Sequence, residues 1–116
     1  MKFTRSLAPN REFRKSYAKA VHRSGRYLTL YDRKGRKGQN RLGLTVTPKV
    51  GCAVVRNRVR RRLREAYRLN EEKFRTGRTL VIVARPESAG ASFWELEDDL
   101  LRIARRMDLL QEPEIS

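Results

Sequence analysis

A continuous apolar run of strand length, TLVIVA at residues 79–84, lies between two segments that have helical periodicity. A run without polar alternation is typical of a central strand that is covered on both faces. The helical segment before it must connect this strand to an earlier one, and a connection of that length favours parallel strands. The run therefore predicts a sheet with helices packed against it.

The helical segment over residues 53 to about 70 has one narrow apolar stripe. At about 100° per residue this stripe contains Val55, Val59, Leu63 and Ala66, with Tyr67 at its flank. Arginines occupy most of the remaining surface, and Arg62 lies at the edge of the stripe, where its stem can pack while its head reaches solvent. We expect a helix that rests on a core with one side and presents guanidinium groups on the others.

A second helix is predicted to begin after Ser92, because Ser92 and Glu95 have the spacing of a capping box. Acidic residues crowd its first turns and arginines come late, as the helix dipole favours. Its apolar stripe comprises Phe93, Leu96, Leu100, Ile103, Ala104 and Met107. We assign to the core, without a function of their own, Val81, Ile82, Trp94, Leu96 and Leu100.

The first half of the chain adds three elements. Asn10 is a candidate N-cap for a helix that ends at Gly25, and alternating segments at 27–31 and 41–47 predict two antiparallel strands. The order helix, two strands, helix, strand, helix predicts an α+β fold, a small two-layer sandwich, in one domain over residues 1–116. We expect the basic arm 1–8 and the tail 111–116 to be loose.

The positive charge of the chain is concentrated in one region. There are 28 Lys and Arg against 13 Asp and Glu, a net charge of +15, and the first 64 residues hold 20 of the cations and 2 of the acids. Such a field attracts a polyanion, and nucleic acid gains affinity by releasing its counterions. An anionic membrane is the weaker candidate, since we find neither a lipid anchor nor a basic helix with a large exposed apolar face.

Three further features concern location. No apolar stretch approaches the roughly 18 residues of a membrane span, and the N-terminus lacks the apolar region of a secretory signal. The single cysteine, Cys52, cannot form a disulfide framework. We therefore expect a cytoplasmic protein.

The sequence has few side chains that could catalyse hydrolysis of a phosphodiester. His22 is the one histidine and is most simply a surface or helix-end residue. Cys52 precedes the arginine-rich helix, whose N-terminus can lower a thiol pKa, but no second histidine is available as its base. The acidic residues at 95–99 could be imagined as a two-metal site, although helix capping accounts for them. We predict no catalytic residue and no metal ligand on this chain.

One segment is more specific than a basic run. Residues 49–61 read KVGCAVVRNRVRR and resemble the K-x-G-x-A-x-x-R-N-R-x-(K/R)-R pattern of the protein subunit of bacterial ribonuclease P. The resemblance includes Phe13, Tyr17, Tyr31 and residues 41–44, and it covers about residues 7 to 110. Arg62 departs from the pattern, because an apolar residue is common there.

The resemblance implies a particular version of the sandwich. The family fold is similar to domain 2 of ribosomal protein S5, with a four-stranded sheet and three helices. It adds a short strand near residues 22–25 and a left-handed βαβ crossover around the arginine-rich helix. That hand would be an exception to the usual right-handed rule.

The resemblance also implies a function. The family protein is the accessory subunit of an endoribonuclease that removes the 5′ leader from precursor tRNA, and the catalytic groups belong to the RNA subunit. The resemblance implies the same role for this chain. Mg²⁺, bound mainly by that RNA, takes part in the hydrolysis. The implied partners are ribonuclease P RNA and precursor tRNA, with no membrane and no small-molecule substrate.

Candidate site residues follow from the matching positions. Contacts with the catalytic RNA are expected from Arg56, Asn57, Arg58, Arg60, Arg61 and Arg64. Arginine forks suit phosphate oxygens, although a solvated helix face is the simpler interpretation. Leader binding in a central cleft is expected from Phe13, Tyr17, Tyr31, Lys15 and Lys49, with Lys19 a weaker candidate. Exposed rings stack on unpaired bases, whereas core packing is the alternative for these rings.

Two other classes of function remain open. A ribosomal or assembly protein of the same architecture would share the charge and the core without needing an aromatic cleft. A stand-alone nuclease would need reactive groups on this chain.

Overall fold

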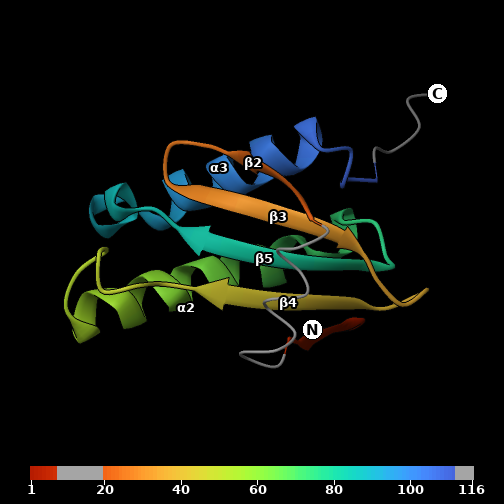
Figure 1. The fold of residues 1–116 in the computed structure, drawn as a ribbon, viewed down its shortest axis with the longest axis horizontal. Coiled ribbons are helices and arrows are strands. Elements are labelled where there is room, and N and C mark those ends of the chain that lie inside the picture. Colours follow the sequence, from red (N-terminus) through yellow and green to blue (C-terminus); the bar gives the residue numbers. More distant parts are fainter. Residues whose placement is uncertain (8–19, 112–116) are drawn as a thin grey trace.

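The computed structural model describes residues 1–7 and 20–111. The predicted helix between Asn10 and Gly25 lies for the most part outside these residues, and so do Phe13, Lys15, Tyr17 and Lys19. Within the described residues, two helices pack behind a sheet (Figure 1). They are α2, Ala53–Asn70, and α3, Phe93–Arg106, and the short turns η1, Glu71–Lys73, and η2, Pro86–Gly90, accompany them. The predicted α+β class is confirmed.

The sheet has five strands in the order β1-β4-β5-β3-β2. Their bounds are β1 Thr4–Ser6, β2 Val21–Ser24, β3 Leu28–Lys34, β4 Asn40–Thr45 and β5 Arg78–Ala84. The apolar run forms the central strand β5, antiparallel to β3 and parallel to β4. The parallel crossover through α2 is therefore confirmed, and so is the short strand near residues 22–25.

Three strand predictions were wrong in part. Strands β3 and β4 do not pair with each other, because β5 lies between them. Alternation shows which face of a strand is buried but not which strand lies beside it. Here the central strand β5 pairs with both β3 and β4. The sheet has five strands rather than four, and the arm expected to be loose supplies the fifth, since β1 pairs in parallel with residues 40–42.

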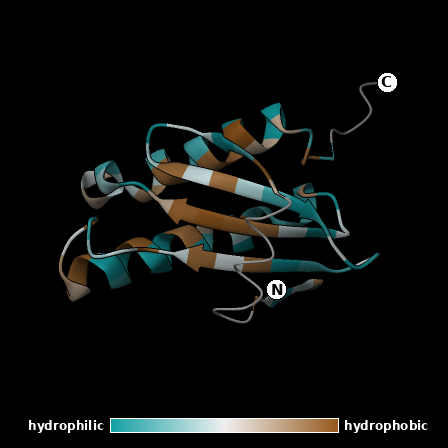
Figure 2. Ribbon diagram, viewed as in Figure 1, coloured by the Kyte–Doolittle hydropathy of each residue, from teal (hydrophilic) through white to brown (hydrophobic). Residues whose placement is uncertain are grey.

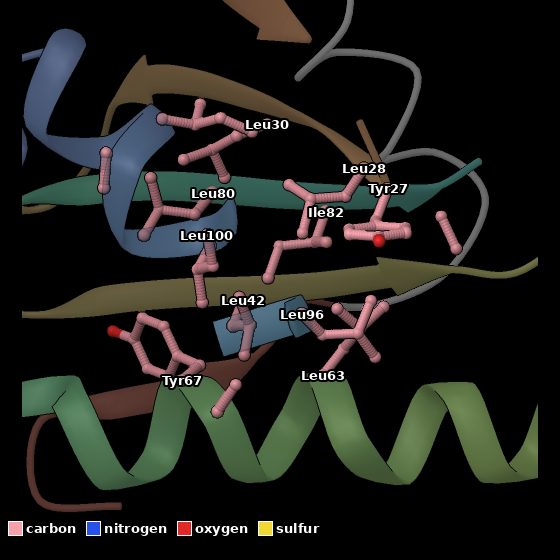
Figure 3. Close-up of a cluster of buried hydrophobic side chains, with 14 of the residues drawn as sticks. Tyr27, Leu28, Leu30, Leu42, Leu63, Tyr67, Leu80, Ile82, Leu96 and Leu100 are labelled. Atoms are coloured by element: carbon pink, nitrogen blue, oxygen red, sulfur yellow. The ribbon is translucent and has the colours of Figure 1, made fainter. Parts of the chain in front are cut away.

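The core lies between the sheet and the two helices. Leu63 and Tyr67 of α2 meet Leu42 and Leu80 of the sheet, with Leu100 of α3 completing the contact (Figure 3). Along α2 the buried residues are Val59, Leu63, Ala66, Tyr67 and Asn70, close to the predicted stripe. Hydropathy shows the same division, with β5 almost wholly apolar and α2 apolar on one side (Figure 2).

Trp94 is the residue of the predicted core that the structure places elsewhere. Its side chain is 72% exposed, whereas Leu96 and Leu100 are fully buried. The reason is helical phase, because residue 94 is about 200° around the helix from residue 96. Val81 and Ile82 are buried as predicted. Of this pair, Ile82 belongs to the cluster beneath the helices and Val81 does not, since successive residues of a strand point to opposite faces.

Candidate nucleic-acid interface

The cationic surface of α2 divides into two flanks and an outer face. One flank, with Arg60 and Arg64, borders strands β1 and β4 at the edge of the sheet. The Arg60 Nη1 donates to Oδ1 of Asn57 at 3.1 Å, which orients this guanidinium along the helix. Arg60 is half-buried and Arg64 is exposed. We call this pair the sheet-edge flank.

The opposite flank is formed by Arg58 and Arg62 and is tied to the loop before α3. The Arg58 Nη2 donates to the Ala89 carbonyl at 3.2 Å, and the Arg62 Nη1 donates to the Ala91 carbonyl at 2.7 Å. Both side chains are half-buried. The head of Arg62 therefore lies on a backbone carbonyl and does not reach into solvent as predicted. We call this pair the loop flank.

The outer face carries Asn57 and Arg61, both exposed. Among described residues, no ion pair involves any of the six residues predicted to contact RNA. The Nε atoms of Arg56 and Arg58 are buried and have no hydrogen-bond partner in the described part of the chain. Cations of like sign on one helix repel one another, so this surface is suited to an anion that neutralises them.

The face of the sheet opposite the helices presents a second group of side chains. Tyr31 of β3 lies across from His22 of β2, and their rings stack with centroids 5.0 Å apart and planes at 28°. Arg33 and Arg41 both align with Thr79 of the central strand, so the sheet places a row of cations beside the ring pair. Stacked rings next to guanidinium groups form a platform of the kind that holds single-stranded nucleic acid.

The structure therefore locates two of the five predicted leader-binding residues. Tyr31 is half-buried on this face, and Lys49 is exposed in the segment between β4 and α2. His22 is exposed, in agreement with the prediction of a surface residue, but its stacking on Tyr31 was missed. The sequence could not predict this ring pair, because the stacking depends on strand β2 lying beside strand β3.

The acidic residues at the start of α3 have separate structural partners. Glu95 closes the predicted capping box with Ser92 and accepts from the Tyr27 hydroxyl at 2.7 Å. The Ser92 backbone N–H and then this hydroxyl hold the pKa of Glu95 below its usual value. Asp99 is buried and accepts from the backbone N–H of Tyr27 at 2.8 Å. Within the described ranges, no group of three or more His, Cys, Asp or Glu is placed to hold a metal ion.

Cys52 stands at the N-cap of α2 and is exposed. The backbone N–H of Val55 in the first turn is the main cause of a lowered thiol pKa, the direction that the sequence predicted. The one histidine of the chain, His22, is on strand β2. Over residues 1–7 and 20–111, no helix has the length and apolarity that crossing a bilayer requires.

The fold and this surface define a small α+β protein with an arginine-rich helix and a partly aromatic sheet face on the side away from the helices. A family model described as Ribonuclease P matches residues 1–108. The chain is 38% identical to the ribonuclease P protein component of Alkaliphilus metalliredigens over 110 residues, which is 95% of this chain and 99% of that protein. It is 37% identical to the component from Clostridioides difficile over 107 residues, covering 91% and 94% of the two chains.

Solved structures agree with this assignment. The ribonuclease P protein from Thermotoga maritima superposes with a TM-score of 0.81 at 26% identity, over 88% of this chain and 96% of that one. The Staphylococcus aureus protein has the same fold, with a TM-score of 0.81 at 21% identity over 91% and 97%. The chain belongs to the ribonuclease P protein family.

Proposed function

We propose that this chain is the protein subunit of a ribonuclease P particle that removes the 5′ leader from precursor tRNA. The observation that supports this most strongly is that none of the six α2 residues predicted to contact RNA takes part in an ion pair among the described residues. Arg56, Asn57, Arg58, Arg60, Arg61 and Arg64 then contact the catalytic RNA, chiefly its phosphates. The curated relatives are named protein components of ribonuclease P, which supports the same role.

The face of the sheet opposite the helices is the proposed site for the leader. Tyr31, backed by His22, offers a ring for stacking on unpaired bases, and Lys49 offers a charge for the backbone. Phe13, Lys15 and Tyr17 complete the proposal as residues of the matching family pattern. Stacking is tolerant of sequence, so one such face can accept different leaders.

In this proposal the catalytic RNA performs the hydrolysis with Mg²⁺ bound mainly by the RNA. The protein binds and orients, and its charge lowers the repulsion between two polyanions, the RNA and the precursor. General acid–base catalysis would require groups that converge on a phosphate, and the acidic side chains of α3 have structural partners instead.

The test is a cleavage assay with purified protein, precursor tRNA and Mg²⁺, with and without the catalytic RNA. The proposal predicts cleavage only when the RNA is present, and faster cleavage with protein at physiological salt. Cleavage by protein alone would assign the chain to the stand-alone nucleases. A failure to stimulate would favour a ribosomal or assembly protein.

The leader site has its own test. Tyr31→Ala is expected to weaken binding of precursor tRNA about tenfold and to leave mature tRNA unaffected, since a stacked base contributes about 1–3 kcal/mol. Equal loss for both substrates would remove Tyr31 from the leader site.

A further inference from the structure

We propose that a hollow between β1, β4 and α2 binds one unpaired nucleotide of the catalytic RNA, with its base on an apolar floor and its phosphate on three arginines. The identity of the RNA rests on the proposed function. The hollow has a volume of about 450 Å³ and opens at the edge of the sheet. Among its lining residues are Arg5, Leu7, Leu42, Leu44, Arg60 and Arg64.

The lining has two chemical parts. Leu7 and Leu42 are buried and Leu44 is half-buried, which gives an apolar base to the hollow. Arg5 comes from β1, whereas Arg60 and Arg64 come from α2, so arginines of two separate elements line the hollow. No acidic residue is found among the described residues that line it. An apolar surface with a few converging charged groups is the usual composition of a ligand site.

The wall formed by β1 is held in place by buried contacts. The Thr4 and Tyr67 hydroxyls are hydrogen-bonded at 2.7 Å, and the Leu7 backbone N–H donates to the Leu42 carbonyl at 2.9 Å. The buried carboxylate of Glu71 accepts from the backbone N–H groups of Lys2 at 2.7 Å and Phe3 at 3.2 Å. These contacts hold the backbone of β1 in place before any ligand arrives, so little ordering of this strand is needed on binding.

The shape of the sheet creates the space. Pairing between β1 and β4 ends at Ser6 and Leu42, whereas β4 continues to Thr45. Arg60 and Arg64 are one helical turn apart and line the hollow beside this stretch of β4. Within the described residues, β4 extends beyond β1 on the side where α2 presents its arginines. The space between these elements is the cationic hollow.

A nucleotide fits this chemistry better than phosphate alone. A bare phosphate would use the guanidinium groups and make no use of the apolar part of the lining, and an apolar ligand would leave three charges without a partner. A base with its 5′-phosphate uses both parts, because arginine forks accept phosphate oxygens in pairs and a base can lie flat on an apolar surface. The volume is within the range of small-molecule sites, about 300–1,000 Å³.

The catalytic RNA is the favoured source because two of the three arginines belong to the α2 surface proposed to bind that RNA. A nucleotide turned out of a loop or bulge of the RNA can enter the hollow while its neighbours contact the rest of α2. Single-stranded nucleotides are the parts of an RNA that proteins can grip in this way.

The experiment is an NMR titration of the full chain with adenosine 5′-monophosphate, adenosine and inorganic phosphate, observing the methyl groups of Leu7, Leu42 and Leu44. Adenosine 5′-monophosphate is expected to shift these methyl signals and to bind at least about tenfold more tightly than the other two ligands. Arg5→Ala should weaken it by a similar factor. The matched control, Arg106→Ala, removes an exposed arginine at the far end of α3 and should leave binding unchanged.

Other results would overturn the proposal. Unchanged leucine signals, or equal binding of phosphate and nucleotide, would mean that there is no nucleotide site. Competition identifies the source: catalytic RNA alone should abolish the nucleotide-induced shifts, whereas displacement only by precursor tRNA would assign the hollow to the substrate. The titration needs no catalysis, so its failure with intact stimulation of cleavage would reject this site and leave the proposed function standing.

Discussion

The two flanks of α2 carry the same residue type in different situations. On the loop flank, Arg58 and Arg62 donate to the carbonyls of Ala89 and Ala91, so these cations help to hold the loop before α3 against the helix. On the sheet-edge flank, Arg60 donates to Asn57 of its own helix, and Arg64 is exposed. The comparison teaches that an arginine-rich helix contains both structural cations and cations available to a ligand.

The largest expected effect is on RNA binding by the sheet-edge flank. The double variant Arg60→Ala, Arg64→Ala should bind the catalytic RNA at least about tenfold more weakly at physiological salt, because two phosphate contacts are lost. Its free energy of unfolding should change by less than about 0.5 kcal/mol, as is usual for surface positions. Filter binding and urea denaturation measure the two quantities. A large loss of stability with unchanged RNA affinity would erase the distinction between the flanks.

The loop flank should behave in the opposite way. Arg62→Ala leaves the Ala91 carbonyl without this donor, and we expect the free energy of unfolding to fall by about 1–2 kcal/mol. Arg62→Met keeps the apolar stem and should recover the packing part of that loss. Urea denaturation of the three proteins tests this. Equal stability of all three would show that the contact with Ala91 contributes nothing.

A smaller effect is expected from the cap that begins α3 next to the same loop. Ser92 accepts from the Glu95 backbone N–H at 3.1 Å, and Glu95 accepts in return from the Ser92 N–H at 2.9 Å. Ser92→Ala should lower the free energy of unfolding by about 1 kcal/mol. Ser92→Asp, which retains a capping oxygen, is the matched control and should lose less. If both variants are equally unstable, the cap is not the cause.

The smallest expected effect concerns the contact that holds β1. Burial favours the neutral form of Glu71, but hydrogen bonds from Thr4, Lys2 and Phe3 outweigh it and hold the pKa below its ordinary value of 4.5. A carboxylate with a lowered folded-state pKa stabilises the fold above its unfolded-state pKa, and this contribution is lost as the pH falls through the folded value. The stability of Glu71→Gln should therefore depend less on pH below about 4.5 than that of the natural chain.

Denaturation at several pH values from neutral to acidic measures that difference. Parallel pH profiles for the two proteins would show that Glu71 does not anchor β1 through its charge.

Much of the fold could be predicted because it follows from local patterns. The stripe of α2, the capping box of Ser92 and the apolar run of β5 each identify an element within a residue or two. The pairing of strands could not be predicted in the same way, since the alternation of β3 and β4 is equally compatible with a direct hairpin and with β5 between them. Trp94 was wrongly assigned to the core, although the apolar stripe of its helix did not include it and its helical phase places it on the exposed side.

The candidate site shows the same division. The arginines of α2 could be located because their positions on the helix follow from the sequence. The difference between the flanks could not, since it depends on where the carbonyls of Ala89 and Ala91 lie. The ring pair of His22 and Tyr31 and the position of Arg5 on β1 beside β4 likewise depend on strand order.

The central claim is that the cations of α2 neutralise phosphates of the catalytic RNA. Arg61 tests it most directly, because this exposed side chain on the outer face can be removed without disturbing a described contact. The measurement is the slope of log affinity for the catalytic RNA against log salt concentration, for the natural chain and for Arg61→Ala. The account predicts that the slope of the variant is smaller by about one unit. An unchanged slope would contradict it.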